Sequence, residues 1–373
     1  MLSTHAQRLE RWLGPEKVEH LSTSMKDWYG PPIAVGGVPG NVWAHSGGDF
    51  SGPIRAGQMS PAIDFVEQRL KRIARNWTQR QLNSVNMAGF SSLSDLINEA
   101  SLGGKRRDYA FQKSGPTGVV NVTSSLWRVG TVPAAGAAGS AAPGGRACTD
   151  ATTGAFSQFW NPGGTDTTHF IGGGVTASVI NNTLLLYDRI FDVAKTMAST
   201  TAESVTGVPT RYQSSTVTDA NYAGGNFLFV EVGGTALAAT AHNWTTCTYR
   251  NQAGTDAQTL PSLTGNSGAI VDRLDHPVGQ WFAPLATGDT GVMDLAQMQC
   301  SASVATGVIN FVIGHPIAML PCPVANLICQ MDGIGSAFNL VRIFDDACLA
   351  FLEICKPATT ATNYAGIFST VAG

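Results

Sequence analysis

The sequence predicts an α+β protein in which an extended N-terminal arm and helices precede a mainly antiparallel β-sandwich or jelly-roll-like region. Three observations lead to this prediction. Residues 30–59 are rich in Gly and Pro, residues 60–82 carry apolar side chains at helical spacing, and from Gly225 onward short apolar runs alternate with Gly-rich turns. The expected domains are an arm at residues 1–59, helices plus strands with an Ala/Gly-rich loop at residues 60–175, and a β-rich domain with one leading helix at residues 176–373.

The N-terminal arm combines a short charged helix, expected near Ala6–Leu13, with the Gly- and Pro-rich stretch at residues 30–59. This stretch holds too few apolar side chains to build a core of its own. An extended segment of this kind needs another surface to lie on. We therefore expect the arm to wrap a neighbouring subunit.

The clearest helix of the sequence begins at Ser60–Pro61, because Ser favours the N-cap and Pro favours the first helical position. Its apolar residues recur at alternating steps of three and four and are Ile63, Val66, Leu70, Ile73 and Trp77. Basic residues follow on other faces and are Arg69, Lys71, Arg72, Arg75 and Arg80. The apolar stripe predicts burial against a helix or sheet of this chain or of the next one.

A shorter helix is expected from about Ser92 to Ser101. Ser92 and Asp95 have the spacing of a capping box, with Asp in place of Glu, and Gly103-Gly104 ends the helix. Residues 117–129 are then expected to form a strand. The Ala-, Gly- and Pro-rich run Thr131–Gly145 has low complexity and predicts a mobile or surface loop.

The segment Asn182–Met197 leads into the β-rich part and is expected to be a helix. Its apolar residues Leu186, Ile190, Val193 and Met197 would share one helical face. The run Leu184–Tyr187 also fits a strand, so both interpretations stay open for this segment.

From Gly225 onward the pattern changes to short strands. The first is expected at residues 226–232, and Thr246–Arg250 and Gln258–Leu260 flank turn residues in a hairpin pattern. Further strands are expected at residues 280–285, 295–301, 308–314, 347–355 and 363–371. Short strands at regular intervals with Gly-rich turns are typical of sandwiches and jelly rolls.

The chain carries few charges for its size. Only 13% of its 373 residues are Asp, Glu, Lys or Arg, which is about half the share that is usual in soluble domains. A monomer normally covers its surface with charge to stay soluble. A neutral surface rich in small residues is more typical of contacts between copies, so the composition predicts a subunit of a particle or lattice.

No secretory or membrane-spanning segment is expected. The first residues, Met1–Arg8, lack an apolar stretch. The most apolar segment, Val308–Leu320, is too short for a membrane span and is interrupted by polar residues, Gly and Pro. We therefore expect cytosolic synthesis and no membrane partner.

The seven cysteines are expected to be reduced, small and buried side chains. They are Cys148, Cys247, Cys300, Cys322, Cys329, Cys348 and Cys355. An odd number without a signal peptide argues for free thiols. Cys322/Cys329 and Cys348/Cys355 repeat one spacing, but no CxxC or CxxH pattern occurs, so burial is favoured over a metal site. No metal and no cofactor are expected.

No catalytic motif stands out, and no catalytic, cofactor-binding or metal-ligating residue is proposed. The most suggestive string is Gly265-Asn266-Ser267-Gly268, which is similar to the nucleophile loop of chymotrypsin-like proteases. His242 and Asp256 precede it in the order that this family uses. However, the chain between His242 and Ser267 is too short to form two β-barrels. A turn is the favoured interpretation, and an enzyme is not expected.

Charge is unevenly distributed along the chain. Residues 1–113 hold 14 Lys or Arg and 10 Asp or Glu, a net charge of +4, whereas residues 114–373 hold 9 and 16, a net charge of −7. The basic N-terminal part suits non-specific contact with nucleic acid or with an acidic neighbour. Ordinary decoration of a helix surface is the competing interpretation.

Four strings between Leu184 and the C-terminus resemble virion structural proteins of tailed bacteriophages. They are residues 186–191 (LYDRIF), 202–212 (AESVTGVPTRY), 249–254 (YRNQAG) and 284–292 (PLATGDTGV). The resemblance implies a non-enzymatic component of the virion, made in many copies, with copies of itself, other virion proteins and packaged nucleic acid as partners. It favours a capsid shell protein, major capsid or decoration, that self-assembles through its arm and β-rich surfaces.

A tail- or neck-associated virion protein is the alternative. Its β-sandwich would then be a glycan-binding module for host adsorption, and Trp244 and Trp281 would hold the sugar rings. Packing of these two residues in the core or at an interface is the competing interpretation.

Overall fold

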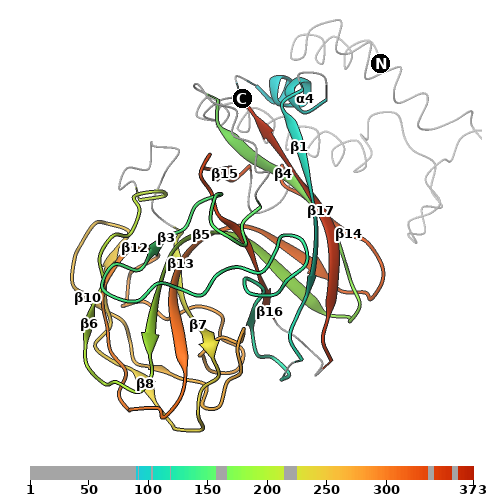
Figure 1. The fold of residues 1–373 in the computed structure, drawn as a ribbon. Helices are drawn as coiled ribbons and strands as arrows, with labels where there is room; N and C mark the ends of the chain where they lie inside the picture. Colours follow the sequence, from blue (N-terminus) through green and yellow to red (C-terminus); the bar gives the residue numbers. More distant parts are fainter. Residues whose placement is uncertain are drawn as a thin grey trace, which may run out of the picture. The chain divides into compact units, whose positions relative to one another are not determined.

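Four antiparallel sheets and one helix form the described part of the chain (Figure 1). The computed structural model describes residues 90, 92–101, 104–117, 119–156, 166–213, 225–334, 340–354 and 360–373. These residues belong to one compact unit, Ile73–Gly373. The helix expected near Ala6–Leu13, the arm at residues 30–59 and the helix expected from Ser60 lie outside the described residues.

The central sheet contains the two longest strands, β5 (Asn182–Thr196) and β13 (Val308–Cys322), of 15 residues each. Its order is β2 (Ser124–Ser125), β16 (Leu349–Ile354), β5, β13 and β7 (Phe227–Thr235), and β3 (Arg146–Ala147) also pairs with β5. All of these pairings are antiparallel. Nearly every residue of β5 and β16 is buried, because other parts of the chain cover both faces of the sheet.

A second sheet packs against one end of the central sheet. Its order is β1 (Arg106–Ser114), β17 (Asn363–Ala372), β4 (Thr168–Ala177) and β14 (Cys329–Asp332), and β15 (Arg342–Ile343) pairs with β4. The inner face of this second sheet contributes Tyr109, Phe111 and Phe368 to an aromatic cluster with Phe351 of β16. Burial of these large rings fixes the second sheet on the central one.

Two small sheets pack against the other end. One has the order β10 (Gln258–Thr259), β9 (Thr248–Asn251), β12 (Val292–Met298) and β6 (Glu203–Ser204), and the other pairs β11 (Leu263–Thr264) with β8 (Asn243–Trp244). Their apolar residues, including Trp244, Tyr249 and Leu295, pack with Phe311 and Ile313 of β13. Loops complete the core around Leu185 and Tyr187 of β5 with Trp127, Ala155 and Leu274.

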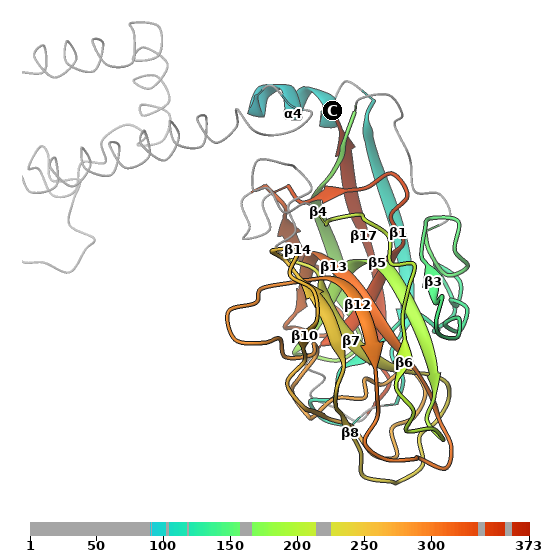
Figure 2. The ribbon, with the colours of Figure 1, turned by 90° about the vertical axis from the view of Figure 1, so that its left-hand side faces the viewer.

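Helix α4 (Leu93–Ser101) lies at the end of the second sheet, close to the C-terminus of the chain (Figure 2). The Ser92 hydroxyl accepts a hydrogen bond from the Asp95 backbone N–H at 3.1 Å, so the predicted N-cap is confirmed. Leu96 of the helix is buried with Phe90 and with Val371 of β17. The helix therefore covers one end of this sheet.

The predicted helix at Asn182–Met197 is wrong, because this segment is strand β5. Residues Leu184, Leu185, Leu186 and Tyr187 are all fully buried, with alternate members in different clusters. A strand covered on both faces has no polar face, so the period of two is lost from its sequence. The strand interpretation of this run was the correct one.

Other predictions differ in part from the structure. Within residues 117–129 the structure describes only β2 as strand, and the strand expected at residues 280–285 is not formed. Strands β1 and β4 were not predicted, and β4 contains Gly172–Gly174, which resembled a turn signal. Strand β4 also runs across the boundary expected between residues 175 and 176.

The β-rich character of the C-terminal half is confirmed. Strands β7, β13, β16 and β17 overlap the predicted ones, and β12 begins three residues before the predicted Leu295. The hairpin is confirmed as β9 paired with β10. The described part is thus a mainly antiparallel β protein, in agreement with the sequence pattern.

Adjacent residues of β17 provide a direct test of the second sheet. Phe368 is fully buried in the aromatic cluster, whereas Ile367 points to the opposite face and is 51% exposed. We expect Phe368→Ala to lower the free energy of unfolding by about 3–5 kcal/mol, and Ile367→Ala to change it by less than about 0.5 kcal/mol. Urea denaturation of the unassembled, monomeric protein measures both free energies of unfolding. Equal losses would show that the faces of β17 are assigned incorrectly.

Candidate functional site

The most unusual feature of the core is a group of charged side chains centred on Arg189 of β5. The pairing of β5 with β13 shifts register between Ile313 and Gly314, which face Phe191 and Arg189. A bulge of this kind re-aims the side chains beside it. Arg189 and Asp192 are both fully buried as a result of their place on this central strand.

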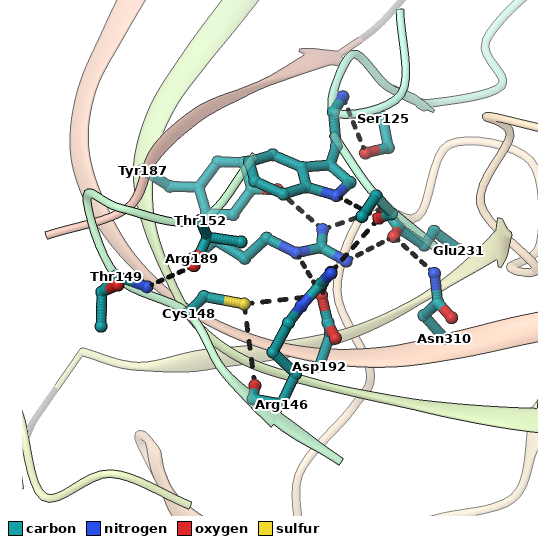
Figure 3. Close-up of polar contacts among 12 residues, drawn as sticks. Ser125, Arg146, Cys148, Thr149, Thr152, Tyr187, Arg189, Asp192, Glu231 and Asn310 are labelled. Atoms are coloured by element: carbon teal, nitrogen blue, oxygen red, sulfur yellow. Dashed lines mark hydrogen bonds and ion pairs between the residues drawn. The ribbon is translucent and has the colours of Figure 1, made fainter. Parts of the chain in front are cut away.

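Two carboxylates hold the Arg189 guanidinium (Figure 3). Its Nη2 donates to Glu231 Oε1 at 2.6 Å and its Nη1 to Glu231 Oε2 at 3.2 Å, so the contact with β7 is bidentate. Its Nε donates to Asp192 Oδ2 at 2.9 Å. Arg146 of β3 donates to the same Asp192 oxygen at 2.5 Å, and Asn310 Nδ2 donates to Glu231 Oε1 at 3.0 Å. This Arg189 cluster thus ties β3, β5, β7 and β13 together.

The loop at Thr131–Gly145 closes over this cluster. The Trp127 ring lies over the Arg189 guanidinium, 4.8 Å from ring centroid to Cζ, and its Nε1 donates to Ala137 O at 3.0 Å. A Cβ on Gly136 would lie 2.1 Å from the Trp127 ring, and one on Gly139 would lie 2.4 Å from Asn310 Oδ1. Most of this loop is exposed, as expected of a surface loop, but Pro133 and Gly136 are buried, so its small residues also allow close packing against the cluster.

A second buried ion pair lies beside the first. Arg211 donates to both carboxylate oxygens of Asp188, at 2.7 and 2.9 Å, and its Nη2 also donates to Cys148 O at 2.8 Å. The Cys348 backbone N–H donates to Asp188 Oδ1 at 2.9 Å. This pair fixes the segment after β6 against β5 and the start of β16.

The charges of these arginines are strongly favoured. Burial opposes the charge on Arg189, but Glu231 and Asp192 outweigh burial and raise the pKa of the guanidinium well above its usual value. Burial likewise opposes the charge on Arg211, and Asp188 outweighs it and raises that pKa. Since Arg189 has no exposed surface and its donors already have partners, the cluster is suited to holding strands together rather than to binding a substrate.

The protease-like string does not form a catalytic triad. His242 pairs with Asp275, at 2.9 Å between Nε2 and Oδ2, whereas Asp256 is exposed and lies 3.6 Å from Arg250. The His242 Nδ1 lies 2.9 Å from Thr240 O, and Ser267 Oγ donates to that same carbonyl. Burial opposes protonation of His242, but Asp275 outweighs burial and raises its pKa. The Ser267 hydroxyl therefore donates to a backbone carbonyl and not to His242, whose two ring nitrogens face Thr240 O and Asp275, and the string forms a turn as predicted.

The two Trp residues of the glycan-binding alternative differ in environment. Trp244 is buried, donates to Asp275 Oδ2 at 2.8 Å and packs edge-on against Phe311. Trp281 is partly buried and packs against Phe227 and Phe282. Trp244 therefore offers no flat face to a sugar ring.

The described residues contain neither a candidate metal site nor a candidate membrane-spanning helix. Within the described ranges, no three His, Cys, Asp or Glu side chains gather in an arrangement that would hold a metal ion. No helix among the described residues is long and apolar enough to cross a membrane.

The most extensive candidate for a binding surface is the outer face of the second sheet. Register and burial place eight residues on it: Ala110, Gln112, Gly174, Thr176, Ile328, Gln330, Ala365 and Ile367. These eight residues are uncharged, whereas Arg106, Asp108 and Asp332 continue the same face toward one end of the sheet. Ile328 and Ile367 are 62% and 51% exposed and both neighbour Gly174.

Comparisons with protein families, curated proteins and solved structures found no match to this chain. Arg211, from residues 202–212, bonds to Asp188, from residues 186–191, so two strings that the sequence analysis singled out lie in contact.

Breaking the Arg189 cluster by one substitution is expected to destabilise the fold strongly. Arg189→Met leaves Glu231 buried without its main partner, so the free energy of unfolding should fall by about 3–5 kcal/mol. The double variant Arg189→Met/Glu231→Leu removes both charges and should lose clearly less than the sum of the two single variants. Urea denaturation of the four proteins measures this coupling, and strictly additive losses would contradict the cluster.

Stability should fall as the pH falls from about 6.5 to 4. His276 Nε2 accepts a hydrogen bond from the Val230 backbone N–H at 2.8 Å, and burial, opposed by Asp275, lowers the pKa of His276 to about 4. Unfolded His binds a proton near pH 6.5, so protons favour the unfolded chain below that pH. His169 and His315 act in the same direction.

The variant His276→Gln tests this dependence, since its amide oxygen can take the position of Nε2 and accept the hydrogen bond from Val230 without binding a proton. Between pH 7 and pH 4.5 it should lose less unfolding free energy than the parent protein. An unchanged pH dependence would show that His276 does not titrate as described.

Proposed function

We propose that the protein is a non-enzymatic structural component of a bacteriophage virion, and specifically a capsid shell protein, either major capsid or decoration. It self-assembles through its N-terminal arm and its β-rich surfaces. The β-rich part is a sandwich or jelly-roll-like module, and its place is in the virion after synthesis in the host cytoplasm.

The observation that carries this proposal is the uncovered outer face of the second sheet. The middle of this face carries small, uncharged side chains around two exposed Ile residues, and exposed apolar side chains gathered in this way are typical of a contact surface. Its small residues let a flat surface approach the backbone closely. A second copy of the chain suits it best, because only 13% of all residues are charged and copies meet with little loss of charge hydration.

The buried ion pairs of the interior also support a structural role. The buried ion pairs of Arg189 and Arg211 bond strands and loops to one another, and Arg189 itself has no exposed surface. Rigid subunits are required where many copies meet in one repeated geometry. The arm at residues 1–59 and the basic residues Lys71, Arg72 and Arg75 remain the proposed contacts to a neighbouring subunit and to packaged nucleic acid.

A tail- or neck-associated protein is the second candidate. Its support is the pair Trp281 and Phe282, since Phe282 is 43% exposed next to a partly buried Trp. The number of copies per particle separates the two candidates. A high copy number supports the shell, and a low one supports the tail or neck.

A charge placed on the outer face should prevent assembly. In Ile367→Asp, a carboxylate replaces an exposed apolar side chain at the centre of this face, and its burial between subunits would be strongly unfavourable. We expect the parent protein to form large homo-oligomers in light scattering after size exclusion, and Ile367→Asp to remain monomeric with an unchanged circular dichroism spectrum.

Val278→Asp is the matched control, because Val278 is 65% exposed but lies in the turn Pro277–Gln280 and not on the outer face. It should assemble as the parent protein does. A parent protein that stays monomeric at micromolar concentration would contradict the proposed function. Normal assembly of Ile367→Asp would show that the subunits contact one another through another surface.

A further inference from the structure

Two cysteine thiols meet where two strands end on the same edge of β5. Strand β16 pairs with β5 up to Asp188, and β3 pairs with it from Phe191 onward. Cys348 and Cys148 occupy the gap between these two pairings. The Arg189 N–H donates to Cys348 O at 2.8 Å, and the Cys148 N–H donates to Ile190 O at 3.0 Å.

Arg189 and Ile190 are consecutive residues of β5, and each makes a backbone hydrogen bond with one cysteine. The bulge at this point directs both hydrogen bonds to the same edge of β5. Both side chains are fully buried in the same apolar cluster as Leu185 and Tyr187. The Cys148 thiol donates to Arg146 O at 3.7 Å and to Asp192 Oδ2 at 3.5 Å, and it also lies close enough to the Cys348 thiol to raise the pKa of Cys348 together with burial. The sequence gives no sign of this pair, because its members lie far apart along the chain.

Three of the other described cysteines bond to backbone carbonyls, as Cys148 also does to Arg146 O, but they differ from this pair in their contacts with neighbouring thiols. Cys247 gives its thiol hydrogen to the carbonyls of Thr245 and Gln299, and Cys322 and Cys329 bond to Leu320 O and Leu327 O. Although Cys247 lies near Cys300 and Cys322 near Cys329, no hydrogen bond joins the thiols of either pair among the contacts described. Cys148 and Cys348 are thus the best placed for a covalent link.

We infer that Cys148 and Cys348 form a redox-dependent disulfide that locks β3 and β16 to each other beside the Arg189 cluster. The site is reduced where thiols are kept reduced and is oxidised when a small disulfide such as glutathione disulfide is in excess. The link would close a long loop of the chain, which disfavours the unfolded state.

The chemistry is thiol–disulfide exchange. One cysteine thiolate attacks glutathione disulfide, forms a mixed disulfide and releases one glutathione. The second cysteine thiolate attacks the protein sulfur of that mixed disulfide and releases the other glutathione. The protein loses two protons and two electrons, and the oxidant is converted to two glutathione thiols that carry both.

Burial, the neighbouring Cys148 thiol and nearby carboxylate charge raise the pKa of Cys348 well above its usual value. The thiolate is therefore scarce in the closed fold, and both sulfurs are out of reach of solvent. Exchange should be slow in the folded protein and fast while the chain is folding, before the core has closed.

The test is to refold the full chain in an excess of glutathione disulfide and to refold a second sample under reducing conditions. Peptide mapping without reduction should recover the Cys148 and Cys348 peptides joined together. The oxidised protein should unfold at a higher urea concentration than the reduced one.

Cys348→Ser should abolish the link and leave Cys148 as a mixed disulfide with glutathione, whereas the matched control Cys247→Ser should keep the link. The mapping of the parent protein does not depend on whether either variant folds. Recovery of Cys148 and Cys348 as free thiols, or joined to other cysteines, in refolded parent protein would overturn the inference.

Discussion

The buried ion cluster of Arg189 is the interaction on which the rest of the structure depends. A guanidinium in an apolar core is tolerated only when carboxylates and hydrogen-bond acceptors surround it. Here Glu231 comes from β7 and Asp192 from β5, and Arg146 of β3 bonds to the same Asp192. The Arg189 guanidinium therefore finds its acceptors only when these strands are in register, which selects one arrangement of the central sheet.

Several local features follow from this constraint. The bulge in β5 turns Arg189 and Asp192 to the cluster, and the small residues Gly136 and Gly139 let a loop close over it. The same bulge brings Cys148 and Cys348 to one edge of β5. The second sheet packs on the central sheet through its inner face. Its outer face is therefore available as a contact surface.

Local sequence signals were enough for some elements and not for others. The cap of α4 and the β9–β10 hairpin were predicted because their signals lie within a few residues. Strand β5 was taken for a helix because burial on both faces removes its alternation, and β4 was missed because Gly172–Gly174 pack closely between neighbouring strands. The Arg189–Glu231 pair and the outer face depend on pairing between distant strands, so neither was visible in the sequence.

The proposed function joins a rigid interior to a sheet face, with exposed Ile328 and Ile367, that a second copy can cover. A cryo-electron microscopy map of the native assembly tests this claim most directly, because it shows which surfaces of the subunit are covered. The account predicts a particle in which a neighbouring subunit covers Ile328 and Ile367 on the outer face of the second sheet. A particle in which that face is open to solvent, or a preparation of single chains, would contradict it.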